Sequence, residues 1–138
     1  MAKPSLSVLI PVYNFSVGCL VDDLLSQLEK SAIDFEIRLY DDYSDASTKE
    51  LNGSLAEKSR VIYKELPQNI GRSKIRNLLA LDAVFDFLLF LDCDCELPNG
   101  NYIQTYISLL NANAASVLNG GRLYKPFNYY KTEHYLHW

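Results

Sequence analysis

Short apolar runs alternate along the chain with longer stretches in which apolar residues recur every three or four positions. The short runs predict buried strands, and the longer stretches predict amphipathic helices. The predicted strands cover residues 6–12, 35–40, 61–63, 87–91 and 115–118, and the predicted helices cover residues 21–30, 72–83 and 102–110. A further helix is expected after Ser44 or Asp45, either of which could cap it. This alternation predicts an α/β fold with a mostly parallel sheet flanked by helices.

The run Phe87–Leu91 is apolar at every position, and we expect it at the centre of the sheet, where helices cover both faces. Ligands of such sheets bind at the carboxyl ends of the strands. Tyr13 follows the first predicted strand, Asp42 follows the second, and Asp92 and Asp94 follow the run 87–91. The sequence therefore predicts that one ring and two acidic clusters meet at one edge of the sheet.

Each of these strand-end groups suits the binding of a nucleotide and a cation. A ring can stack on a base, which contributes roughly 1–3 kcal/mol. A carboxylate at Asp42 can accept a base N–H or a ribose hydroxyl, and the D-x-D pair can hold Mg²⁺ or Mn²⁺ against phosphates. Acidic residues after strands also often cap the next helix. Capping is the favoured role for Asp45, whereas capping and binding are equally supported for Asp42.

The net negative charge of the chain is compatible with a nucleotide site, but it argues against one class of partner. The formal net charge is −4, and the basic residues are scattered apart from Arg72, Lys74 and Arg76. A nucleic-acid binder needs clustered Lys and Arg, so we expect no nucleic-acid partner. The small cluster suits either one phosphate-bearing ligand or a solvated helix face. Hydrophobic residues make up 49% of the 138 residues, enough for the core of a single domain.

The cysteines and the N-terminus indicate a reducing compartment. Cys19, Cys93 and Cys95 are odd in number and lack the spacing of a disulfide framework or a zinc site, so we expect free thiols. The first apolar run is too short for a signal peptide. These features predict a cytoplasmic protein, with peripheral association at the inner membrane face left open.

Four segments occur in the order and spacing of the motifs of a known family. They are SVLIPVYN at 7–14, FEIRLYDDYSD at 35–45, NIGRSKIRN at 69–77, and FLDCD at 90–94 with Pro98 after it. Over roughly residues 5–100 the chain resembles the family 2 glycosyltransferases. The resemblance implies a GT-A fold and a nucleotide-diphosphate sugar donor. UDP is the expected nucleotide, and GDP or dTDP remain alternatives.

The resemblance also implies roles for individual residues. Pro11 and Tyr13 would lie against the base, Asp42 would contact the base edge, Arg76 would lie near the diphosphate, Asp92 would contact ribose or sugar, and Asp94 would ligate Mn²⁺ or Mg²⁺. Two positions depart from the family pattern. Tyr43 stands where the family often has glycine, and Cys95, followed by Glu96, stands where many relatives have a third acidic residue. The segment 119–122 receives no role.

An inverting transferase of this family also needs a general base, which lies well past the D-x-D motif. Glu133 and the two histidines of the tail do not fit the family's base motif. We therefore expect residues 1–138 to be the donor-binding portion of one GT-A domain, cut off before its acceptor-binding half. The whole protein would transfer a sugar to a glycan or lipid-linked acceptor. The alternatives are an inactive nucleotide- and metal-binding module and, less favoured because no glycine-rich loop follows the first strand, a nucleotidyltransferase.

Overall fold

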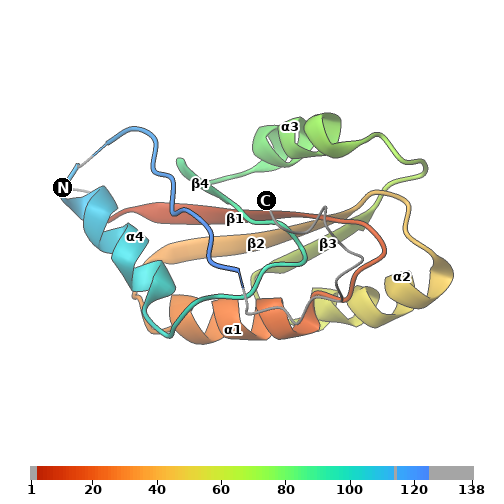
Figure 1. Cartoon of the computed structure of the whole chain (residues 1–138), viewed down its shortest axis with the longest axis horizontal. Coiled ribbons are helices and arrows are strands. Elements are labelled where there is room, and N and C mark those ends of the chain that lie inside the picture. The colour runs from red at the N-terminus through yellow and green to blue at the C-terminus, as the bar shows by residue number, and fades with distance from the viewer. Residues whose placement is uncertain (1–2, 114, 125–138) are drawn as a thin grey trace, which may run out of the picture.

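A computed structural model describes residues 3–113 and 115–124, and it has the predicted α/β architecture (Figure 1). The elements in chain order are β1 (Ser5–Val12), α1 (Gly18–Leu28), β2 (Asp34–Asp41), α2 (Ala46–Gly53), the 3₁₀ turn η1 (Ser54–Glu57), β3 (Val61–Glu65), α3 (Arg72–Asp82), β4 (Phe87–Phe90) and α4 (Tyr102–Asn111). The four strands form one parallel sheet in the order β3-β2-β1-β4. Among the described residues, no helix is long and apolar enough to cross a membrane.

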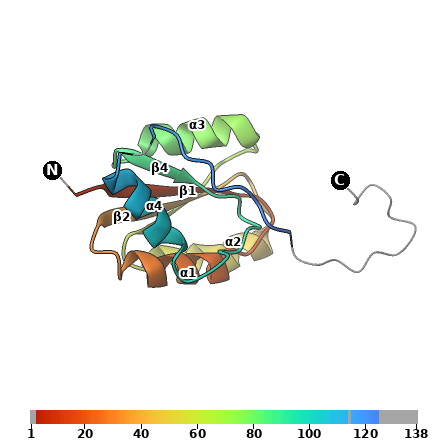
Figure 2. The same cartoon turned by 60° about the vertical axis from the view of Figure 1, so that its left-hand side comes forward.

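Helices cover both faces of the sheet, with α3 on one side and α1, α2 and α4 on the other (Figure 2). Successive side chains of β1 point to opposite faces of the sheet. Val8 and Ile10 pack with α1 and α4 on one face, and Leu9 packs against Ile75 of α3 on the other. Because β1 lies between β2 and β4, it is buried on every side. This central strand and its register with β2 fix which strand ends come together.

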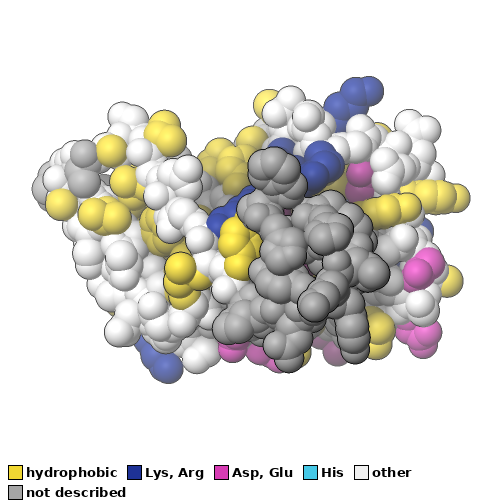
Figure 3. Space-filling model, viewed as in Figure 1, with side chains coloured by type: hydrophobic (Ala, Val, Ile, Leu, Met, Phe, Trp, Pro, Cys, Tyr) yellow, Lys and Arg dark blue, Asp and Glu magenta, His cyan; other side chains and the backbone are white. Residues whose placement is uncertain are grey.

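Two expectations about the sheet are wrong. The run beginning at Phe87 forms β4, which lies at an edge of the described sheet and not at its centre. Phe87, Leu88 and Phe90 remain 37–42% exposed, and apolar side chains are visible between α4 and α3, where β4 runs (Figure 3). Residues 115–118 form no strand, and Val117 is 85% exposed. An apolar run predicts a strand, but it does not encode which strands pair with it or how fully its side chains are covered.

Asp45 caps α2, as the sequence predicts. Its carboxylate accepts the backbone N–H of Thr48 at 2.8 Å and the hydroxyl of Ser47 at 2.9 Å, and these bonds, led by Thr48, lower the pKa of Asp45. Ser44, the other candidate, does not cap the helix. Its hydroxyl accepts the N–H of Asn14 at 2.8 Å and so ties the end of β2 to the loop after β1.

Glu36 is a buried carboxylate of β2 that interacts with three donors. It accepts the Ser7 hydroxyl at 2.7 Å and the Val84 N–H at 2.9 Å, and its Oε1 lies 2.9 Å from Nε of Arg38. Burial by itself raises the pKa of Glu36, but the bonds from Arg38, Val84 and Ser7 outweigh it and leave the pKa below the ordinary value. The ionised form is therefore the one that stabilises the fold.

We expect Glu36→Gln to lower the free energy of unfolding at neutral pH by about 1–3 kcal/mol, because it leaves the guanidinium of Arg38, whose side chain is only 13% exposed, without its counter-charge. The native carboxylate has a lower pKa when folded. The stabilisation by Glu36 is therefore complete above the pKa that its carboxyl group has in the unfolded chain, roughly 4–5. It is lost as the pH falls through the lower pKa that the group has in the folded chain. Urea denaturation between pH 3 and 7 would show this loss in the native chain and a flatter profile in the variant. Glu57→Gln, at an exposed position, is the control, and an equal effect of both changes would contradict the assignment.

Candidate functional site

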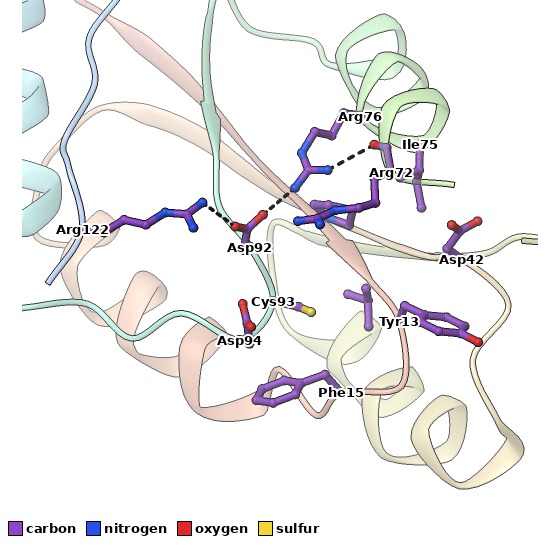
Figure 4. Close-up of a pocket in the computed structure, with 12 residues that line it drawn as sticks. Tyr13, Phe15, Asp42, Arg72, Ile75, Arg76, Asp92, Cys93, Asp94 and Arg122 are labelled. Atoms are coloured by element: carbon purple, nitrogen blue, oxygen red, sulfur yellow. Dashed lines mark hydrogen bonds and ion pairs between the residues drawn. The ribbon is translucent and has the colours of Figure 1, made fainter. Parts of the chain in front are cut away.

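An open pocket of about 440 Å³ lies where the carboxyl ends of β1, β2 and β4 meet the start of α3 (Figure 4). Its lining includes all the residues that the sequence singled out, namely Pro11, Tyr13, Asp42, Arg76, Asp92 and Asp94. Parallel register brings them together, since Val12 of β1 pairs with Asp41 of β2, and Leu9 pairs with Phe90 just before Asp92. Arg72, from the basic cluster that the sequence offered for a phosphate-bearing ligand, also lines the pocket, and the sequence indicated no binding role for the lining residues Val12, Phe15, Ile75, Cys93 and Arg122.

The loop after β1 presents two rings on a fixed backbone. Tyr13 is 54% exposed and Phe15 is 45% exposed, so both rings can be reached by a ligand. Asn14, at a φ of +48°, bridges to the next strand end by accepting the Asp45 N–H at 2.8 Å. Buried Asn52 of α2 accepts the Val17 N–H at 3.0 Å and donates to the Phe15 carbonyl at 2.9 Å. A shaped loop with exposed rings is what a stacking subsite requires.

Asp42 has a structural role that the sequence did not indicate. Its carboxylate accepts the backbone N–H of Ile70 at 2.7 Å and of Gly71 at 3.0 Å, so it braces the loop before α3 and does not cap α2. Asn69 donates to the Asp42 carbonyl at 3.0 Å, and Gly71 has a φ of +84°, which favours glycine. Asp42 nevertheless lines the pocket. An ionised carboxylate offers about four lone-pair positions, so it can still accept a ligand N–H.

The two carboxylates of the D-x-D segment have different environments. Asp92 is clamped between two guanidinium groups, with Arg76 of α3 at 2.5 Å from Oδ1 and Arg122 at 3.0 Å from Oδ2 (Figure 4). Asp94 is exposed, and no described side chain donates a hydrogen bond to it or pairs with it. Arg122 could not be found from the motifs, because it lies 30 positions after Asp92 and reaches the pocket only through the path of the chain beyond α4.

The donor set of the pocket limits how a metal ion can be held. Within residues 3–113 and 115–124 there is no group of three or more His, Cys, Asp and Glu side chains that could bind a metal. Asp94 supplies one open carboxylate, and Asp92 already serves two arginines. Mg²⁺ is often held by one or two carboxylates together with the phosphates of a substrate. The residues therefore fit a cation shared with a phosphate ligand and do not fit a metal held by the protein alone.

The pocket also contains a thiol. Cys93 and Cys95 are half-buried, and burial raises the pKa of each, so both favour the neutral form. Cys19 is exposed on α1, and all three cysteines are free thiols. Cys93 therefore offers a slow-reacting probe inside the pocket, with Cys19 as an internal reference outside it.

Known proteins resemble this chain over most of its length. The family model for glycosyl transferase family 2 matches residues 7–138. A chondroitin synthase from Escherichia coli is 27% identical over 126 residues, which cover 86% of this chain and 17% of that protein. An uncharacterized glycosyltransferase from Haemophilus influenzae is 34% identical over 101 residues, which cover 72% of this chain and 40% of that protein. The chain thus spans less than half the length of either relative.

Solved structures share the fold. S. aureus TarS (residues 1–349) in complex with UDP-GlcNAc matches with a TM-score of 0.69 and 23% identity, over 88% of this chain and 37% of that one. The mannosyltransferase PcManGT from Pyrobaculum calidifontis, in complex with GDP-Man and Mn²⁺, matches with a TM-score of 0.63 and 18% identity, over 83% and 34%. At these identities the likeness concerns the fold and agrees with the GT-A arrangement. Because the family model matches nearly the whole chain, the chain belongs to glycosyl transferase family 2.

Proposed function

We propose that this chain is the donor-binding portion of an inverting glycosyltransferase that uses a UDP-linked sugar. The observation that carries the proposal is the convergence of exposed rings, arginines and the D-x-D carboxylates on one pocket. The complexes of TarS with UDP and with UDP-GlcNAc support a uridine nucleotide. The name of the E. coli relative, a chondroitin synthase, supports a glycan acceptor, and a lipid-linked sugar is the alternative.

Each group has a place along a nucleotide sugar. Tyr13 stacks on the base beside Pro11, and Asp42 accepts the N–H that the edge of a uracil ring presents. Arg76 and Arg72, both on α3, face the diphosphate. Asp92 accepts hydroxyl groups of ribose or sugar. This order follows the pocket from the strand end of β1 toward that of β4 (Figure 4).

Asp94 is the proposed ligand for a divalent cation. Without a cation, Asp94 and Asp92 would repel a diphosphate, so the acidic edge needs a counter-charge. When bound, Mn²⁺ or Mg²⁺ would neutralise the diphosphate and stabilise the charge that builds up on it as the bond to the sugar breaks. The Mn²⁺ complex of PcManGT supports a divalent ion.

Transfer with inversion also requires a base to take the proton from the acceptor hydroxyl. The described carboxylates of the pocket are engaged otherwise: Asp42 with the loop before α3, Asp92 with two arginines, and Asp94 with the proposed cation. We therefore propose that the chain by itself binds donor without turning it over. A binding module without catalysis is the second candidate for the whole protein, and UDP release on addition of acceptor by the full-length protein would exclude it.

Modification of Cys93 tests whether UDP occupies this pocket. We expect iodoacetamide to label Cys93 more slowly than exposed Cys19 in the free chain, because burial disfavours the thiolate. Saturating UDP with Mn²⁺ should slow the labelling of Cys93 further and leave that of Cys19 unchanged. Peptide mapping by mass spectrometry in a Cys95→Ser background measures both rates. Equal labelling of Cys93 with and without UDP would contradict donor binding at this site.

A further inference from the structure

We infer that Arg122 belongs to the subsite for the donor's sugar, where it and Asp92 together bind neighbouring hydroxyl groups. The inference rests on the proposed function and adds to it a residue outside the four family-like motifs. Arg122 follows α4 and is 30 positions from Asp92, yet its guanidinium lies 3.0 Å from Oδ2 of that carboxylate. Arg76 holds the other oxygen from α3. The two arginines approach Asp92 from different segments of the chain.

The position of Arg122 along the pocket separates it from the base and phosphate groups. Tyr13 and Asp42 lie at one end of the pocket, and Arg122 lies at the other end, beyond Asp92 (Figure 4). Arg72 and Arg76 lie between these ends. A nucleotide sugar whose base stacks on Tyr13 therefore places its diphosphate by the α3 arginines and its sugar toward Arg122.

The chemistry of the Arg122–Asp92 pair suits hydroxyl groups. A guanidinium has five N–H donors and no acceptor, and an ionised carboxylate has acceptors only. Each sugar hydroxyl both donates and accepts, so two neighbouring hydroxyls can donate to Asp92 and accept from Arg122. One nitrogen of Arg122 contacts Asp92, and its other guanidinium N–H groups bond to no residue that the structure describes. The pair thus presents donors and acceptors side by side.

The difference in exposure between Arg122 and Arg76 indicates that they have different roles. The Arg122 side chain is 72% exposed and that of Arg76 is 30% exposed. An ion pair as exposed as that of Arg122 contributes little to stability, because water screens it. Arg122 can therefore turn toward a ligand at little cost to the fold. Arg76 is fixed more firmly, since it also donates to the Arg72 carbonyl at 3.2 Å within α3.

A comparison of UDP with UDP-sugars tests the inference. Binding of UDP, UDP-glucose, UDP-galactose and UDP-GlcNAc would be measured by calorimetry with Mn²⁺ for the native chain, Arg122→Gln and Arg76→Gln. We expect Arg122→Gln to weaken the best-bound UDP-sugar on the order of tenfold, as for a lost bond to a charged group, and to leave UDP without measurable change. Arg76→Gln, the matched change on the same carboxylate, should weaken UDP and UDP-sugar alike. The affinity of Arg122→Lys for the UDP-sugar should lie between those of the native chain and Arg122→Gln, because lysine keeps the charge but lacks the planar set of N–H donors of a guanidinium.

The outcomes separate this inference from the proposed function. Equal weakening of UDP and UDP-sugar by Arg122→Gln would make Arg122 a phosphate ligand and overturn the inference alone. Unchanged binding of both would also overturn it, as would a native chain that binds UDP but none of the three UDP-sugars. Failure of the native chain to bind UDP would overturn the proposed function itself. Thermal melting of each variant would verify that it is folded.

Discussion

Asp94→Ala should abolish the Mn²⁺-dependent part of UDP binding while leaving the fold intact. Asp94 is exposed in the pocket, and no described side chain bonds to it, so its removal breaks no internal contact. Changing even the outer partners of a metal site costs about 10–100-fold in affinity. Loss of a direct ligand should therefore lower UDP affinity in Mn²⁺ on the order of 100-fold. Calorimetry with Mn²⁺ and with EDTA measures the difference.

The control for this change is Asp86→Ala, which removes another exposed carboxylate, at the opposite end of β4. It should leave both the affinity and its dependence on Mn²⁺ unchanged. Mn²⁺ without nucleotide should bind only weakly to the native chain, because the described part contains no three-ligand cluster. An Asp94→Ala chain that kept its Mn²⁺-dependent affinity would remove Asp94 from the site.

Tyr13→Ala should weaken UDP binding by about 1–3 kcal/mol, the range measured for base–aromatic stacking. The ring is 54% exposed, so its loss should have little effect on stability. Tyr13→Phe should bind as the native chain does, because stacking needs the ring and not the hydroxyl. Fluorescence or calorimetric titration with UDP gives the three affinities.

Two controls make the stacking test specific. Ribose-5-phosphate has no base, and its binding should not change in Tyr13→Ala; an equal loss for both ligands would contradict stacking. Tyr43 is also 54% exposed but does not line the pocket, and its ring lies 4.8 Å from the Lys49 ammonium. Tyr43→Ala should therefore leave UDP affinity unchanged.

Much of the candidate site could be predicted from the sequence because parallel strands end at one edge. Once β1, β2 and β4 are recognised, residues such as Tyr13 and Asp92 must lie near each other whatever the details of packing. The cap at Asp45 was predictable for a similar reason, since its partner Thr48 is only three residues away. Features that depend on residues a few positions apart, or on the register of neighbouring parallel strands, can therefore be predicted from the sequence.

Features that depend on distant partners could not be predicted. The bonds of Asp42 to Ile70 and Gly71 cross 28 and 29 positions, so no local pattern separates this brace from a helix cap. Arg122 reaches Asp92 only because of the path that follows α4. The edge position of β4 depends on what pairs with it, which its own apolar residues do not encode. Tyr43 is an intermediate case: its φ of +70° is a conformation that favours glycine, the residue that the family resemblance leads us to expect there.

The most direct test of donor binding is calorimetric titration of the native chain with UDP in the presence of Mn²⁺, compared with UDP in EDTA and with CDP in Mn²⁺. The account predicts saturable heat for UDP that weakens strongly without the cation. CDP should bind less well, because a cytosine ring has no ring N–H for Asp42 to accept. Absence of heat at millimolar UDP and Mn²⁺ would contradict the assignment of this pocket as a nucleotide-sugar site.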